Sequence, residues 1–157
     1  MPVGLWNQST FATPSALVAA IDPDNSCARV QPGVRNLAIS EAAKPHGLYY
    51  APDPSSQIAC SIGGNVAENA GGGRAIKYGV TGRYVLGLEA VLPTGEIVQL
   101  GGKRVKDVTG YDLIHLLVGS EGTLGIFTQI TLRLVPQPAA RAVLLVPFED
   151  VPTAIAT

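Results

Sequence analysis

Residues 52–73, PDPSSQIACSIGGNVAENAGGG, form the most informative stretch of the chain. The stretch combines Pro- and Gly-rich turns with small hydroxyl and amide side chains, and it has few large apolar side chains that could pack a core. Glycine lets the main chain approach a ligand closely and adopt positive φ, and exposed backbone N–H groups bind phosphate or ring oxygens. The stretch therefore predicts a backbone cradle for a large ligand, either the pyrophosphate of a dinucleotide or the edge of a planar ring.

Length and composition set the broad class of the protein. The 157 residues are 46% apolar and carry a net charge of −1, which suits one domain, or one domain and a piece of another. This near-neutral charge argues against nucleic acid and anionic membranes as partners. We expect free thiols at Cys27 and Cys60, with a single bridge as the alternative. No apolar segment approaches the roughly 20 residues of a spanning helix, and no signal peptide is recognisable.

The first half of the chain is predicted to consist of short helices, a turn and a strand. Thr-Pro at the start of residues 13–20 favours a helix there, and residues 22–25 favour a turn. Residues 27–31 have the pattern of a strand, and residues 36–44 that of a helix ended by Pro and Gly. A short helix over 61–69, capped by its serine and ended by the following glycines, is predicted inside the glycine-rich stretch.

The second half changes to strand patterns. Residues 84–92 and 97–100 flank a Pro-Thr-Gly-Glu turn and predict a β-hairpin. Residues 112–118 predict a helix, and apolar residues alternate with polar ones over 126–134, which predicts a half-buried strand. After two prolines, residues 143–148 predict a further strand, followed by a helix beginning at Val151. These last elements are typical of the start of a second domain.

No catalytic or metal-binding set emerges from the residues alone. His46 and His115 are the only histidines, and a histidine at a helix end or beside leucines is more often structural than catalytic. No Cys/His/Asp spacing matches a metal site. Glycines 119, 122 and 125 are spaced by three and precede a strand, so they do not form the Gly-x-Gly-x-x-Gly turn of a Rossmann fold. The alternative to a ligand cradle is a turn-rich surface loop capped by glycines.

Three long segments carry a family resemblance. They are residues 52–72, residues 76–98 (IKYGVTGRYVLGLEAVLPTGEIV) and residues 106–138 (KDVTGYDLIHLLVGSEGTLGIFTQITLRLVPQP). In this order they closely resemble the FAD-binding domain of the vanillyl-alcohol-oxidase type, also called PCMH-type. Within that group the chain is most similar to the FAD-linked subunit of glycolate oxidase and to D-lactate and other D-2-hydroxyacid dehydrogenases.

The resemblance implies an α+β fold: the second subdomain of a PCMH-type FAD-binding domain, a small antiparallel sheet flanked by helices. It implies an unmatched segment over 1–20, the FAD-binding subdomain over 21–138, and the start of a C-terminal cap (substrate) domain over 139–157. The phosphate loop that the family carries before this region, similar to Pro-Gly-Gly-Gly-Thr, is not found in the sequence. We therefore expect a chain truncated at both ends.

The resemblance also implies a cofactor, FAD held without a covalent bond, and the residues that contact it. It assigns no catalytic residue. Arg74 departs from the family pattern, and we expect it to be a solvated surface residue rather than a phosphate contact. The implied cofactor contacts are Pro52, Asp53, Ser55, Ser56, Gly63, Gly64, Asn65, Asn69, Gly71, Gly72, Tyr78, Gly79, Glu121, Gly122, Leu124, Gly125 and Ile126.

By this resemblance the chain is the FAD-binding part of an oxidoreductase that oxidises a small 2-hydroxy acid, glycolate or D-lactate. Hydride would pass to flavin N5, and electrons would leave through other oxidase subunits. We expect a cytoplasmic protein, peripheral to the membrane only through such a partner, and no activity from this chain alone. Two alternatives stay open: a non-catalytic truncated product, and a superfamily member with other chemistry, such as an aldonolactone oxidase or an ether-lipid synthase.

Overall fold

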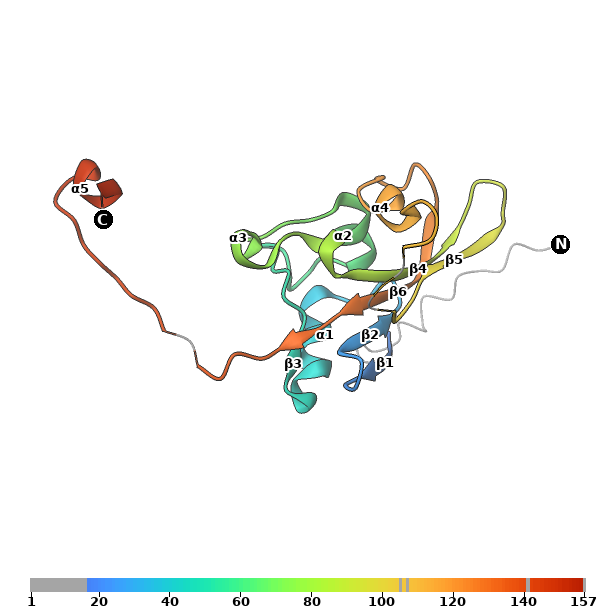
Figure 1. The fold of residues 1–157 in the computed structure, drawn as a ribbon, viewed down its shortest axis with the longest axis horizontal. Coiled ribbons are helices and arrows are strands. Elements are labelled where there is room, and N and C mark those ends of the chain that lie inside the picture. The colour runs from blue at the N-terminus through green and yellow to red at the C-terminus, as the bar shows by residue number, and fades with distance from the viewer. Residues whose placement is uncertain (1–16, 105, 107, 141, 157) are drawn as a thin grey trace.

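The computed structural model describes residues 17–104, 106, 108–140 and 142–156. Their centre is a five-stranded antiparallel sheet with strand order β1-β2-β6-β4-β5, drawn in Figure 1. The strands are β1 (Val18–Asp22), β2 (Cys27–Val30), β4 (Val85–Val91), β5 (Ile97–Gly101) and β6 (Ile126–Arg133). A second, two-stranded sheet pairs β3 (Leu48–Tyr49) with β7 (Val135–Pro136).

Short helices cover one face of the large sheet. Ile39, Ile62 and Leu117 come from three different helices and join the buried side chains of β2, β4 and β6 in one core. This arrangement, helices on one side of an antiparallel sheet, confirms the predicted α+β class. The helices are α1 (Asn36–Ala43), the 3-10 turn η2 (Lys44–His46), α2 (Ile62–Glu68), α3 (Ala75–Tyr78), the 3-10 turn η3 (Thr81–Tyr84), α4 (Leu113–Leu117) and α5 (Val151–Ala156).

The predicted strand over 126–134 is confirmed as β6, but its alternation is interrupted. Glu89 of β4 pairs with Gln129, and the next residue of β4 pairs with Phe127, so Thr128 is an extra residue in the ladder. A β-bulge of this kind moves the side chains beyond it to the opposite face. As a result Phe127 is 7% exposed and faces the core, whereas Ile126 is 70% exposed. The sequence predicted one apolar face over the whole strand. For the residues before the bulge, this prediction is therefore wrong.

The N-terminal helix predicted over 13–20 is also wrong where the structure can test it. Residues 13–16 lie outside the described residues, and Val18–Asp22 is strand β1, paired with β2. The turn between these strands is confirmed, because Asp22 accepts the backbone N–H of Asn25 at 3.1 Å. Pairing with a neighbouring strand overrides the helical preference of the alanines in this segment.

Other predicted elements of the first half agree with the structure. Strand β2, helix α1 and the capped helix α2 occur where the sequence placed them. Helix α2 ends one residue early, at Glu68, because Asn69 takes the left-handed conformation (φ 52°) that was expected of the glycines after it. The thiols of Cys27 and Cys60 are free, as predicted.

The C-terminal segment contains one confirmed element and one error. Helix α5 begins at Val151 as predicted, but residues 143–148 form no strand. A strand needs a neighbouring strand for its backbone hydrogen bonds, and Figure 1 shows this segment leading away from the sheet. Its apolar side chains, among them Val143 and Leu145, are largely exposed. Within the residues described, none of the helices is long and apolar enough to cross a membrane.

Candidate functional site

The start of helix α2 lies unusually close to the loop after β2. Gly63 donates its backbone N–H to the carbonyl oxygen of Pro32 at 2.9 Å. A Cβ atom on Gly63 would lie 2.7 Å from the Cβ of Pro32, so a side chain at this position does not fit. The hydroxyl of Ser61 accepts the N–H of Gly64 at 3.4 Å and caps the helix. Glycine is thus required here for close approach of two backbone segments.

A second glycine-rich segment is fastened to the other end of α2. The backbone N–H of Gly119 donates to the carbonyl oxygen of Val66 at 3.0 Å, and that of Glu121 donates to the carbonyl oxygen of Ala67 at 2.9 Å. Glu121 has a positive φ of 52°, which is uncommon outside glycine. These bonds bring the segment 119–125 beside α2, although Gly119 follows Val66 by 53 residues in the chain.

Together the two segments line an open cavity of about 450 Å³, which we call the glycine hollow. It unites five of the predicted cofactor contacts, two from α2 and three from the segment that leads into β6. All of its lining residues are uncharged. The hollow is lined by Pro32, Gly33, Ser61, Gly63, Gly64, Ala67, Gly122, Gly125, Ile126 and Phe127. A surface of this kind suits an uncharged planar ring, because no carboxylate has to be desolvated when the ring binds.

Asn65 is placed differently from the glycines on either side of it. Its side chain is 5% exposed and donates to the amide oxygen of Asn36 at 3.0 Å. Asn36 in turn donates to the carbonyl oxygen of Pro52 at 3.0 Å. The two buried amides therefore connect α2 to the start of the glycine-rich stretch. Sequence reasoning missed Asn36, because nothing in the pattern of helix 36–44 distinguishes its first residue.

Two further predicted contacts, Asp53 and Gly72, lie at an ion pair. Asp53 accepts two hydrogen bonds from Arg74, one from the backbone N–H at 2.9 Å and one from Nε at 2.7 Å. A Cβ atom on Gly72 would lie 2.2 Å from the carbonyl oxygen of Asp53, so the two segments touch. The guanidinium of Arg74 lies over the ring of Tyr49, 5.7 Å from its centroid. The expectation that Arg74 is a solvated surface residue is therefore wrong.

Tyr78 stands at the edge of the same cluster. Its ring meets that of Tyr49 edge to face, with centroids 6.2 Å apart. Burial raises the pKa of Tyr49 to about 12, and the hydrogen bond from Tyr49 lowers the pKa of Tyr78. Gly79 has φ 82°, a left-handed conformation that favours glycine.

Further predicted contacts lie in loops away from both places. Asn69 accepts the backbone N–H of Gly82 at 2.8 Å, which holds the loop containing Gly71 against η3. Ser55 and Ser56 are exposed in a turn and line neither the glycine hollow nor the ion pair. The predicted list thus does not form one site. Part of it lines the hollow, part lies at the Asp53–Arg74 ion pair, and others, among them Asn65, Asn69 and the two serines, belong to neither place. The cofactor contacts themselves stay predictions.

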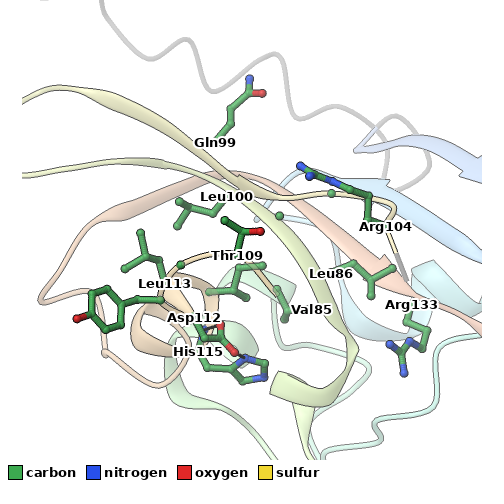
Figure 2. A pocket seen from close by; sticks show the side chains of 15 residues that line it. Val85, Leu86, Gln99, Leu100, Arg104, Thr109, Asp112, Leu113, His115 and Arg133 are labelled. Carbon is green, nitrogen blue, oxygen red and sulfur yellow. Dashed lines mark hydrogen bonds and ion pairs between the residues drawn. The ribbon is translucent and has the colours of Figure 1, made fainter. Parts of the chain in front are cut away.

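A second cavity, of about 430 Å³, lies between β4, β5 and the segment leading into α4. Figure 2 shows Leu86, Leu100 and Leu113 around its middle, with Arg133 and the Asp112–His115 pair among the residues at its rim. Asp112 Oδ2 lies 2.7 Å from His115 Nδ1. The backbone N–H of His115 is the main cause that holds the pKa of Asp112 below its usual range. None of the predicted cofactor contacts lines this cavity.

No group of three or more His, Cys, Asp or Glu side chains in the described ranges is arranged to hold a metal ion.

Comparison with known proteins gives the family context. A family model described as an FAD binding domain matches residues 15–101. Glycolate oxidase subunit GlcD of Escherichia coli K12 is 56% identical over 131 residues, which are 83% of this chain and 26% of that protein. GlcD of Bacillus subtilis 168 is 51% identical over 140 residues, which are 89% of this chain and 30% of that protein.

Further relatives carry other names. A D-lactate dehydrogenase of Anaerostipes hadrus is 46% identical over 140 residues, 89% of this chain and 29% of that protein. Among solved structures, an alkyldihydroxyacetonephosphate synthase superposes with a TM-score of 0.67 at 28% identity, covering 78% of this chain and 22% of that one. The chain thus spans between 26% and 30% of the length of these three curated relatives. The match to these proteins confirms the predicted family resemblance and fold.

Proposed function

We propose, from the premise that this chain belongs to the family of FAD-binding domains, that it forms one wall of the FAD site of an oxidoreductase acting on a 2-hydroxy acid. The observation that carries the proposal is the glycine hollow. It brings Gly63 and Gly64 together with Gly122, Gly125 and Ile126, from two motifs that are far apart in the sequence.

The residues of the hollow fit the ring system of FAD better than its phosphates. The backbone N–H groups of Ile62 and Gly63 already donate to carbonyl oxygens, and that of Gly64 faces the Ser61 hydroxyl. The start of α2 therefore offers a closely packed surface with small side chains. Its first backbone N–H groups already have acceptors and are not available to phosphate oxygens. Gly63, Gly64, Gly122, Gly125 and Ile126 would hold an uncharged part of the cofactor by contact and by exclusion of water.

When bound, FAD supplies the hydride acceptor, and the protein supplies orientation and a dry surface. The substrate class rests on the names of the relatives. Two of these names, glycolate oxidase and D-lactate dehydrogenase, concern 2-hydroxy acids. They belong to proteins 56% and 46% identical to this chain, whereas the alkyldihydroxyacetonephosphate synthase is 28% identical. This difference favours a 2-hydroxy acid over ether-lipid chemistry.

The word "subunit" in the name of the glycolate oxidase relative supports a multi-subunit enzyme. We propose that electrons leave the flavin through such a partner, which would also place the protein at the cytoplasmic side of a membrane. The substrate groups and the base of the reaction are not assigned to any residue of this chain. Turnover by the isolated 157-residue chain of glycolate or D-lactate, with FAD and a dye acceptor, is therefore not expected and would contradict this division of roles.

The test is flavin binding with a matched pair of variants. Ile126 and Ile97 are 70% and 67% exposed and both pair with Val91, but only Ile126 lines the hollow. Ile126→Glu should weaken FAD binding about tenfold, because it places a carboxylate against the cofactor. Ile97→Glu should leave the affinity within about twofold. Titration followed by quenching of flavin fluorescence measures both, and equal effects of the two variants would exclude the hollow as the site.

The absence of a covalent bond to the flavin is tested separately. Acid precipitation of the loaded protein should leave the yellow colour in the supernatant. Colour retained in the pellet would show a covalent flavin and contradict this part of the proposal.

A further inference from the structure

The ion pair between Asp53 and Arg74 lies in a part of the glycine-rich stretch that was predicted to meet the cofactor. The Asp53 side chain is 17% exposed and that of Arg74 is 32% exposed. Both oxygens of the carboxylate accept from Arg74, Oδ1 from the backbone N–H and Oδ2 from Nε. The pair is thus held by two bonds, one of which does not depend on the arginine side chain.

The arginine is fixed from a second direction. Its guanidinium lies over the Tyr49 ring, and that ring is itself braced edge to face by Tyr78. An arginine with a carboxylate on one side and an aromatic face beneath it loses little further freedom when a ligand arrives. Gly72 touches the backbone of Asp53, so the loop 71–74 and the segment 52–53 form one continuous surface.

The charge of Asp53 is a problem for a cofactor that carries phosphates. A carboxylate beside a pyrophosphate is repulsive, and partial burial weakens the screening by water. The guanidinium of Arg74 at 2.7 Å removes most of this repulsion. The pair presents a surface with no net charge, as the glycine hollow does by having no charged side chain.

We propose that Arg74 is a positioning residue that masks the carboxylate of Asp53 and fastens the 71–74 loop to it, so that a phosphate-bearing flavin can lie along this wall. The proposal rests on the proposed function, because it requires FAD to meet this surface. Arg74 acts here through Asp53 and not by direct contact with a phosphate.

Two flavins and three variants test the masking. FAD carries the pyrophosphate and riboflavin carries no phosphate. Riboflavin affinity therefore measures the contacts of the flavin with this surface in the absence of phosphate charge. Arg74→Gln should weaken FAD binding about tenfold and riboflavin binding less than about twofold. Asp53→Asn combined with Arg74→Gln removes both charges and should restore FAD affinity to within about threefold of wild type. Asp53→Asn alone should not weaken FAD binding by more than the double variant.

Other results would overturn the masking. If the double variant binds FAD as poorly as Arg74→Gln, the arginine contacts the phosphate directly. If FAD and riboflavin lose affinity equally in Arg74→Gln, the effect is a general loosening of the wall. Arg29→Gln, an exposed arginine on β2, is the matched control and should change neither affinity. A change as large as that of Arg74→Gln would mean that net charge alone explains the result.

The outcome also separates this inference from the proposed function. If the wild-type chain binds neither flavin, the proposed function fails for this chain and the masking fails with it. If it binds both flavins and Arg74→Gln changes nothing, only the masking is wrong. Fastening is measured without any ligand, by amide hydrogen exchange. Arg74→Gln should speed exchange at Gly72, Gly73 and residue 74 about fivefold or more, and unchanged exchange would overturn the fastening.

Discussion

Two cavities of this molecule have nearly the same volume and differ in the charge of the residues that line them. The glycine hollow, about 450 Å³, is lined only by uncharged residues, five of them glycines. The cavity of Figure 2, about 430 Å³, has an apolar middle and a rim that includes Arg133 and the Asp112–His115 pair. Size therefore does not distinguish them. What distinguishes the glycine hollow is that five of the predicted cofactor contacts line it, whereas none of them lines the other cavity.

The largest predicted effect comes from a substitution that places a side chain where α2 approaches the Pro32 loop at the glycine hollow. Gly63→Val would place a branched side chain against Pro32, whose backbone oxygen and Cα lie 3.1 and 3.3 Å from the new Cβ. Backbone atoms cannot move aside easily, so we expect a loss of about 3 kcal/mol in the free energy of unfolding. Urea denaturation measures the loss. Gly73→Ala is the matched control, because its Cβ would meet nothing within 4 Å, and it should change stability by less than about 0.5 kcal/mol.

A Gly63→Val protein as stable as Gly73→Ala would mean that the contact between α2 and the Pro32 loop is loose. The close backbone approach that defines the hollow would then not hold in solution.

The next largest effect is expected at the two buried amides that connect α2 to the start of the glycine-rich stretch. Asn65→Ala would leave the side-chain oxygen of Asn36 without the donor it has at 3.0 Å. A buried polar group without a partner costs about 2 kcal/mol, and flavin affinity should fall as well, because Asn36 also holds Pro52. Asn25→Ala, in an exposed turn, is the control and should cost under about 1 kcal/mol. Equal losses in the two variants would show that the buried pair has no special role.

The smallest predicted effect tests the difference in charge between the two cavities. The pKa of Asp112 is lowered from its ordinary value of 3.8, first by the backbone N–H of His115. A lowered pKa in the folded state means that the stabilisation is complete above about pH 4 and is lost as the pH falls through the folded value. Below pH 4, NMR signals of α4 should therefore shift before those of the first turn of α2, where the hollow has no titrating side chain.

Asp112→Asn should abolish the early shift of the α4 signals. Simultaneous shifts of α2 and α4 in the wild-type chain would show that the two cavities titrate as one unit and contradict the contrast.

Local patterns predicted much of this fold. The hairpin of β4 and β5, helix α1 and the Ser61-capped helix α2 were recognisable because turn residues, caps and periodicity act within a few residues. The bulge at Thr128 was not, since it is decided by pairing with β4, far away in the chain. Strand β1 was missed although its partner β2 follows after a short turn, because the alanines of β1 favour a helix. The segment 143–148 failed for the converse reason, because its strand pattern finds no partner strand among the described residues.

The site, like the fold, was predictable only where it depends on local sequence. Both glycine motifs were recognised, but their meeting in one hollow depends on two backbone bonds between α2 and the segment 119–125. Asp53 and Arg74 are 21 residues apart, and neither residue type signals the other. The buried Asn36–Asn65 pair spans 29 residues. Pairwise contacts at such separations leave no periodic trace in a single sequence.

The extra residue in β6 has a consequence for how this sequence can change. Ile126 and Phe127 both line the glycine hollow, Ile126 from the exposed face of β6 and Phe127 from the face that packs on the core. Thr128, at the bulge, sets the phase with which the strand enters the sheet. Substitution at this position should be tolerated far better than deletion, because losing one residue would rotate both apolar side chains relative to the core. At this position, the presence of a residue therefore matters more than which residue it is.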